Sequence, residues 1–133
     1  MFGFGDKFSQ GEKVFPLVPD ENFPEKYCEG FEEVLEVYNK KTPKIKLHGP
    51  TNFAPLIKKS IEIVKSGPRL EYHILVIITD GQVTPDKEKE TIDSIVEASK
   101  YPLSIIIIGV GDGPWGKMKC YDDELPERNF DNV

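Results

Sequence analysis

Apolar residues recur along this chain with two spacings, one typical of helices and one of buried strands. From Tyr27 to Lys40 they fall at i, i+3, i+4 and i+7, and acidic residues occupy the opposite face. The spacing predicts an amphipathic helix that ends at Thr42-Pro43. Its apolar stripe consists of Phe31, Val34, Leu35 and Tyr38.

A second helix is predicted from about Asn52 to Ser66. Thr51 or Asn52 can cap its first turn, where Pro55 is also tolerated. Gly67-Pro68 is a typical helix end. The buried stripe of this helix is expected to contain Ile57, Ile61 and Val64.

Two continuous apolar runs, His73–Thr79 and Leu103–Val110, predict strands that are covered on both faces. Between them, Thr84-Pro85 begins a third helix. Strand, helix and strand joined by short loops form a βαβ unit, in which the two strands are parallel. The stripe of the third helix is expected to contain Ile92, Ile95, Val96 and Ser99.

The rest of the chain gives weaker patterns. Short strands are expected near Phe2–Phe4 and Val14–Leu17, a helical turn near residues 117–123, and the start of a strand near residues 129–133. The prediction for the whole chain is therefore an α/β fold with a mostly parallel sheet, in one domain of residues 1–133.

Composition and charge narrow the range of partners. The net charge is −6, and the only adjacent basic pairs are Lys40-Lys41 and Lys58-Lys59, which argues against nucleic acid and anionic membrane as direct partners. No apolar run approaches the roughly 20 residues of a membrane span, so direct membrane insertion is not expected. Cys28 and Cys120 lie far apart without metal-ligand spacing, which indicates reduced thiols and a cytoplasmic protein.

The candidate chemistry lies at the carboxyl ends of the predicted parallel strands, where ligands bind in open α/β sheets. Asp80 follows directly on a buried strand, and Thr51 stands at the start of a helix. A carboxylate and a hydroxyl at one sheet edge suit a hard cation such as Mg²⁺ or Mn²⁺. The spacing alone nevertheless favours structural roles, with Thr51 as a helix cap and Asp80 as a turn residue.

Other site classes fit less well. The segment 111–116 has the spacing G-x-G-x-x-G of a dinucleotide loop, but Pro114 interrupts it and the sequence ends before a second strand could finish. Neither a G-x-S-x-G elbow nor a phosphate-binding loop occurs. Gln82 stands where a phosphatase-like use of Asp80 would need a second acid. We therefore predict that the chain is not an enzyme.

Several motifs resemble those of the copine family, in the family's order and at its intervals. Three further segments are similar to the copine branch of plant-type RING ubiquitin ligases. The first set is Gly3–Gly5, Leu47–Pro55, Leu75–Gly81 and Ala98–Gly111, and the second is Gln82–Thr84, Tyr101–Leu103 and Gly111–Trp115.

This resemblance implies a three-layer, Rossmann-like von Willebrand factor A fold with a mostly parallel central sheet. It also implies a metal-ion-dependent adhesion site in which Thr51 and Asp80 are ligands of Mg²⁺ or Mn²⁺. An acidic residue of a protein partner can complete the metal shell of such a site. The function implied is that of a protein-interaction module.

One part of the family's pattern does not occur in this sequence, namely the Asp-x-Ser-x-Ser-like motif of the first strand. The N-terminal strand or strands are therefore expected to be missing, and the metal to bind weakly. The strand at Ile74–Thr79 would then have an open edge, which favours a homo-oligomer. The alternative is a structural or regulatory role without metal, through this sheet edge or the acidic surface.

Overall fold

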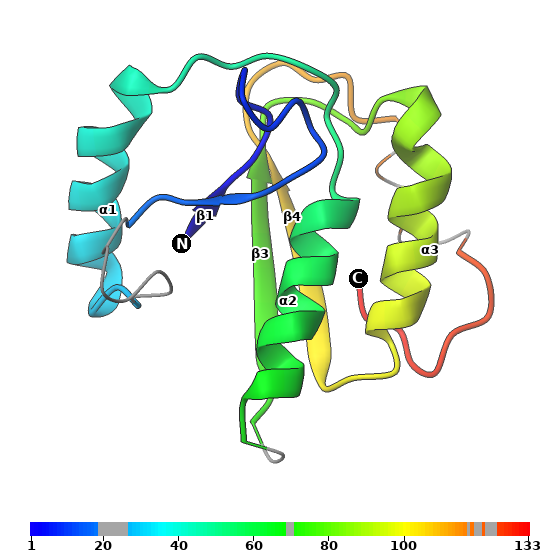
Figure 1. Cartoon of the computed structure of the whole chain (residues 1–133). Helices are drawn as coiled ribbons and strands as arrows, with labels where there is room; N and C mark the ends of the chain where they lie inside the picture. The colour runs from blue at the N-terminus through cyan, green and yellow to red at the C-terminus, as the bar shows by residue number, and fades with distance from the viewer. Residues whose placement is uncertain (19–26, 69–70, 117, 119–120, 122–124) are drawn as a thin grey trace. The chain divides into compact units, whose positions relative to one another are not determined.

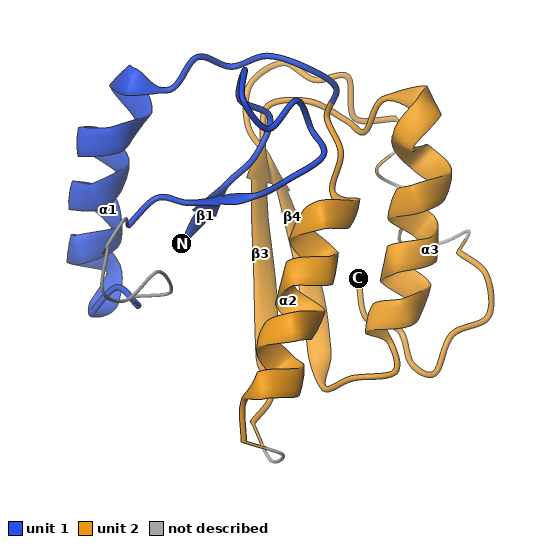
Figure 2. Cartoon of the chain, viewed as in Figure 1, with its two compact units in different colours: residues 1–50 blue, residues 51–133 orange. Residues whose placement is uncertain are grey.

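The computed structural model describes residues 1–18, 27–68, 71–116, 118, 121 and 125–133. The chain divides into two compact units, residues 1–50 and residues 51–133 (Figure 2). None of the helices in these described ranges is long and apolar enough to cross a membrane. Cys120 and the acidic residues at 122–124 lie outside the described residues.

The first unit contains the two short strands and the first helix that the sequence predicts. Strand β1 (Phe2–Gly3) pairs antiparallel with β2 (Phe15–Pro16). Helix α1 (Gly30–Lys41) continues into a 3-10 turn, η1 (Thr42–Lys44), so the α-helix ends at the predicted place. No residue of α1 is buried, and its apolar side chains Phe31 and Leu35 are 87% and 61% exposed.

The second unit contains the predicted βαβ unit, preceded by a helix (Figure 1). The pairing of β3 and β4 is parallel and runs from His73 opposite Leu103 to Thr79 opposite Gly109. The parallel pairing confirms the α/β fold class. In chain order, the elements are α2 (Ala54–Ser66), β3 (His73–Thr79), the 3-10 turn η2 (Pro85–Lys87), α3 (Glu88–Ala98) and β4 (Leu103–Gly109).

Helix α2 packs against β3, β4 and α3 and provides much of the core of this unit. The three stripe residues predicted for α2 are buried, as is Ile95 of α3. Ser99 is also buried, whereas Ile92 and Val96 are partly exposed. The third helix begins as a 3-10 turn at Pro85, where the missing amide of proline costs no helical hydrogen bond.

The two faces of the β3–β4 sheet differ. Odd-numbered residues such as Ile77 and Ile105 are 2% exposed, whereas even-numbered residues such as Val76 and Ile106 are 49% and 47% exposed. Within residues 51–133, α2 therefore covers one face of the sheet, and no described element of this unit covers the other. A continuous β-branched run indicates a strand with apolar residues on each face, but it does not reveal which face a helix covers.

The C-terminal tail lies along β4 and α3 without forming the expected strand. The carbonyl of Asn132 accepts a hydrogen bond from the Ile105 amide at 2.7 Å, and its Nδ2 donates to the Ile95 carbonyl at 3.0 Å. The amide of Asn129 donates to Ser99 Oγ at 3.1 Å. The helical turn expected at residues 117–123 falls largely outside the described residues.

Candidate functional site

The first predicted site residue, Asp80, follows directly on β3. Thr79 fixes the turn after it, because its hydroxyl donates to the Gly81 carbonyl at 2.8 Å and accepts from the Gly81 amide at 3.3 Å. Asp80 is exposed, and its carboxylate has no hydrogen bond or ion pair with any described residue. The turn thus presents an unpaired carboxylate at the carboxyl end of the strand.

The second predicted site residue, Thr51, precedes α2. Here the structure distinguishes between the two possible caps, because Asn52 Oδ1 accepts a hydrogen bond from the Ala54 amide at 3.0 Å. The hydroxyl of Thr51 makes no hydrogen bond with a described residue. Asn52 therefore bonds the first turn from the position before the N-cap residue Phe53, which has no side-chain capping bond of its own. The Thr51 hydroxyl can serve as a ligand.

Backbone hydrogen bonds hold these two loops together. The carbonyl of Thr51 accepts from the Thr84 amide at 3.0 Å and from Thr84 Oγ1 at 3.3 Å. A Cβ atom built on Gly81 would lie 4.0 Å from Thr51 Oγ1, so this hydroxyl lies beside the residue that follows Asp80. The structure therefore brings Thr51 and the Asp80 turn together at one sheet edge. Thr84, which contributes two of the connecting bonds, was predicted only as a helix start.

A polar cluster that sequence reasoning did not identify supports the Thr51 loop. Lys58 Nζ lies 2.7 Å from Glu90 Oε1, and Asn52 Nδ2 donates to Glu90 Oε2 at 3.4 Å. Lys58 lowers the pKa of Glu90, and Asn52 contributes to the same shift, which partial burial opposes. Asn52 is 1% exposed, so the cluster anchors a buried residue next to Thr51. The spacing of residues along a helix identifies its polar face, but it does not predict which charged residues of α2 and α3 form an ion pair.

A third segment at this edge follows β4. The amide of Val110 donates to the Thr79 carbonyl at 2.9 Å, which joins it to the end of β3. The ring of Trp115 lies against Gly109, where an added Cβ would come within 3.0 Å of ring carbon Cζ3. A side chain at residue 109 would require the ring to shift by a few tenths of an ångström, so the loop after β4 packs closely on the strand end.

The donor set of this edge consists of oxygen atoms. The described residues contain no group of three or more His, Cys, Asp or Glu side chains that could hold a metal ion. Thr51 and Asp80 offer one hydroxyl and one carboxylate, both of which suit Mg²⁺ or Mn²⁺. They fit such a cation as two of its ligands, and water or a partner's carboxylate would have to supply the others.

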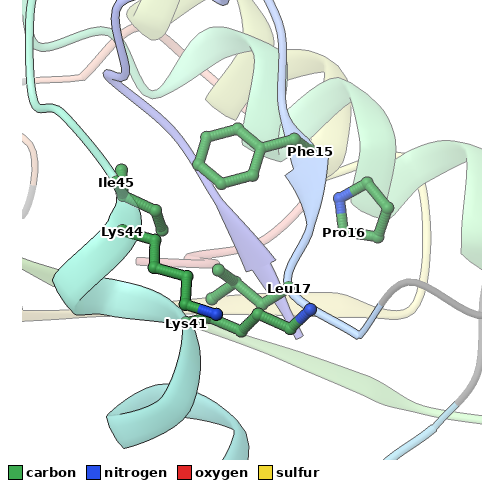
Figure 3. A pocket seen from close by; sticks show the side chains of 6 residues that line it. All are labelled: Phe15, Pro16, Leu17, Lys41, Lys44 and Ile45. Carbon is green, nitrogen blue, oxygen red and sulfur yellow. The ribbon is translucent and has the colours of Figure 1, made fainter.

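A shallow pocket lies in the first unit (Figure 3). Its lining combines apolar side chains with two lysines, so it offers apolar contact and positive charge. None of the predicted site residues belongs to it. The lining residues are Phe15, Pro16, Leu17, Lys41, Lys44 and Ile45.

Comparison with known proteins relates the whole chain to one family. A family model described as Copine matches residues 1–132. The E3 ubiquitin-protein ligase RGLG5 of Arabidopsis thaliana is 46% identical over 98% of this chain and 31% of its own length. Copine family protein 2 of Caenorhabditis elegans is 52% identical over 98% of this chain and 2% of its own length. Copine family protein 1 of the same organism is 48% identical over 99% of this chain and 11% of its own length. The chain thus spans less than a third of each of these relatives.

Proposed function

Because the chain belongs to the copine family, we propose that it is a protein-interaction module in which Thr51 and Asp80 hold a divalent cation. The parallel α/β architecture agrees with the von Willebrand factor A-like fold of that family. Two observations carry the proposal. The Thr51 hydroxyl and the Asp80 carboxylate make no hydrogen bond or ion pair with a described residue, and hydrogen bonds between Thr84 and Thr51 join the loops on which they lie.

The cation at this edge would be Mg²⁺ or Mn²⁺, with Thr51 Oγ1 and the Asp80 carboxylate as its protein ligands. When bound, it supplies a positive centre for an acidic side chain of a partner protein. Two ligands hold such an ion weakly, because Mg²⁺ keeps several waters and each protein ligand contributes only part of the binding free energy. Recognition of the partner is therefore metal-dependent, and the partner's carboxylate strengthens metal binding in return.

The same proposal assigns no catalysis to this chain. Its relatives include proteins named ubiquitin ligases and proteins named only as copine family members, and both kinds share the region that the chain covers. Because proteins that are not named ubiquitin ligases also contain this region, its presence supports a binding role and not ligase activity. The proposal also places the chain in the reducing cytoplasm, which agrees with the free thiol of Cys28.

The test is a thermal melt of the chain with and without millimolar Mg²⁺ or Mn²⁺. A cation at about ten times its dissociation constant stabilises the native state by about 1.4 kcal/mol, which gives a visible rise in Tm. We expect this rise to disappear in Asp80→Asn and in Thr51→Val, each of which removes one ligand with little change of shape. Asp86→Asn, at an exposed aspartate of η2, is the matched control and should keep the rise.

The second candidate function is a structural or regulatory role without metal. It is favoured by the exposed apolar face of the β3–β4 sheet, where Ile74 and Ile78 are 60% and 62% exposed. Large exposed apolar patches mark interaction surfaces. A cooperative melt that no divalent cation changes, in wild type as in Asp80→Asn, would contradict the metal proposal and leave this second role.

A further inference from the structure

The loop that carries Thr51 is held at two points by one segment of the chain, residues 84–90. At the first point, the Thr51 carbonyl accepts hydrogen bonds from the Thr84 amide at 3.0 Å and from Thr84 Oγ1 at 3.3 Å. At the second point, Glu90 Oε2 accepts a hydrogen bond from Asn52 Nδ2 at 3.4 Å. Both points lie inside the second unit. Two consecutive residues of the loop are therefore tied to the beginning of α3.

Asn52 links the second point to the backbone of the loop. Its side chain is 1% exposed, and its Oδ1 accepts a hydrogen bond from the Ala54 amide at 3.0 Å. Rotation of this amide group would break the bonds on its oxygen and its nitrogen and leave buried polar atoms without partners, which is costly. Glu90 therefore helps to fix the orientation of the residue next to Thr51.

The second oxygen of the Glu90 carboxylate is also held. Lys58 Nζ lies 2.7 Å from Glu90 Oε1, so the carboxylate contacts Asn52 with one oxygen and Lys58 with the other. Lys58 lies on α2 and Glu90 on α3, so this ion pair joins the two helices. The place of the carboxylate is thus fixed from α2 while it holds Asn52.

We propose that Thr84 and Glu90 are positioning residues of the cation site, which set the place of the Thr51 hydroxyl without touching the cation. This inference rests on the proposed function, because it takes Thr51 Oγ1 as a ligand. The hydroxyl is one of the two proposed protein ligands, so a displacement of this atom should weaken binding of the cation. Mg²⁺ demands near-ideal octahedral geometry, so its affinity is a sensitive measure of such a displacement.

Titration of the whole chain with Mg²⁺, followed by the amide resonances of Thr51 and Gly81 in NMR spectra, tests the proposal. Glu90→Ala should raise the Mg²⁺ dissociation constant about tenfold, the lower end of the range for residues that orient metal ligands. Thr84→Val removes one hydroxyl and leaves the amide bond to Thr51, so it should raise the constant less, by about threefold.

Glu90→Gln separates the effect of position from that of charge. The amide oxygen of the glutamine can still accept from Asn52, so this variant should recover most of the affinity that Glu90→Ala loses. A carboxylate that acted on the cation only through its charge would give the same loss in both variants, and that result would overturn the proposal. Ile61→Val is the control for stability, because it shortens a buried side chain of α2 outside the polar cluster. It should lower the free energy of unfolding and leave the dissociation constant unchanged.

A double-mutant cycle with Thr51→Val gives a second readout. Without the Thr51 hydroxyl Glu90 has no ligand to position, so Glu90→Ala should change the remaining affinity by less than about twofold. An equal loss with and without the hydroxyl overturns the proposal. If the Thr51 and Gly81 resonances of the wild type do not respond to Mg²⁺, the proposed function and the positioning role both fail. If the wild type binds Mg²⁺ and the variants bind it equally well, only the positioning role fails.

Discussion

Helices α1 and α2 have the same kind of sequence and different surroundings. They contain 12 and 13 residues, and each carries an apolar stripe at helical spacing. Five residues of α2 are buried, whereas none of α1 is. The periodic pattern thus predicts the helix and identifies its apolar face, but not whether another element covers that face.

The β3–β4 sheet repeats this contrast on a smaller scale. Its odd-numbered face is packed beneath α2, and its even-numbered face is exposed although it is equally apolar. Each fully buried aliphatic side chain contributes about 1.5–3 kcal/mol relative to an exposed one. The stability of the second unit should therefore depend on the α2 side of its sheet, and exposed stripes should contribute little.

The largest effect should come from truncating one stripe residue of each helix. Ile57→Ala in α2 opens a cavity at a residue that is 1% exposed, and it should lower the free energy of unfolding by about 2–5 kcal/mol. Leu35→Ala in α1 removes a side chain that is 61% exposed and should change it by at most about 0.5 kcal/mol. Urea unfolding followed by circular dichroism measures both. Similar losses in the two variants would contradict the difference in packing.

Neither N-cap residue, Glu29 in α1 or Phe53 in α2, makes a side-chain capping bond, so the residue just before α2 should sharpen the same comparison, with a smaller change in the free energy of unfolding. Asn52→Ala removes the acceptor of the Ala54 amide and the donor to Glu90, and should cost about 1–2 kcal/mol. Glu29 occupies the N-cap of α1 without a side-chain capping bond, so Glu29→Ala should change stability by less than about 0.5 kcal/mol. Asn52→Asp keeps the acceptor and should recover part of the loss. If Asn52→Ala were as stable as wild type, Asn52 would not anchor the Thr51 loop.

Much of this fold follows from sequence pattern. The bounds of β3 are those of the apolar run His73–Thr79, and α2 buries the three stripe residues expected of it. The covered face of the sheet could not be predicted, because a β-branched strand has apolar residues on both faces whatever packs there. The tail at Asn132 forms single hydrogen bonds instead of a strand ladder, and a composition pattern cannot distinguish the two.

The sequence places the candidate residues of the site at one sheet edge, but it does not reveal the contacts that support them. Thr51 and Asp80 follow from the rule that ligands bind at strand carboxyl ends, and the structure places their loops together. Metal binding by this pair stays a prediction. The bond from Thr84 to the Thr51 carbonyl spans 33 residues, and no local spacing encodes such a contact.

The smallest predicted effect concerns pH and the bridge between α2 and α3. Lys58 lowers the pKa of Glu90 below its ordinary value of 4.5. A carboxyl group whose pKa is lower in the folded state stabilises that state above its unfolded pKa, and this stabilisation is lost as pH falls through the folded pKa. The Lys58 and Glu90 side chains are 51% and 40% exposed, so solvent screening limits the effect to about 0.2–1 kcal/mol.

Lys58→Ala should therefore reduce the loss of stability between about pH 5 and pH 3, and added salt should reduce it similarly in the wild type. Urea unfolding at each pH measures this dependence. Lys40→Ala changes an exposed lysine in the last turn of α1 and serves as the control, with the pH dependence of the wild type expected. If both variants kept the same pH dependence, the Lys58–Glu90 contact would contribute nothing to folding. The contrast between the two helices would then rest on apolar packing and the Asn52 hydrogen bonds alone.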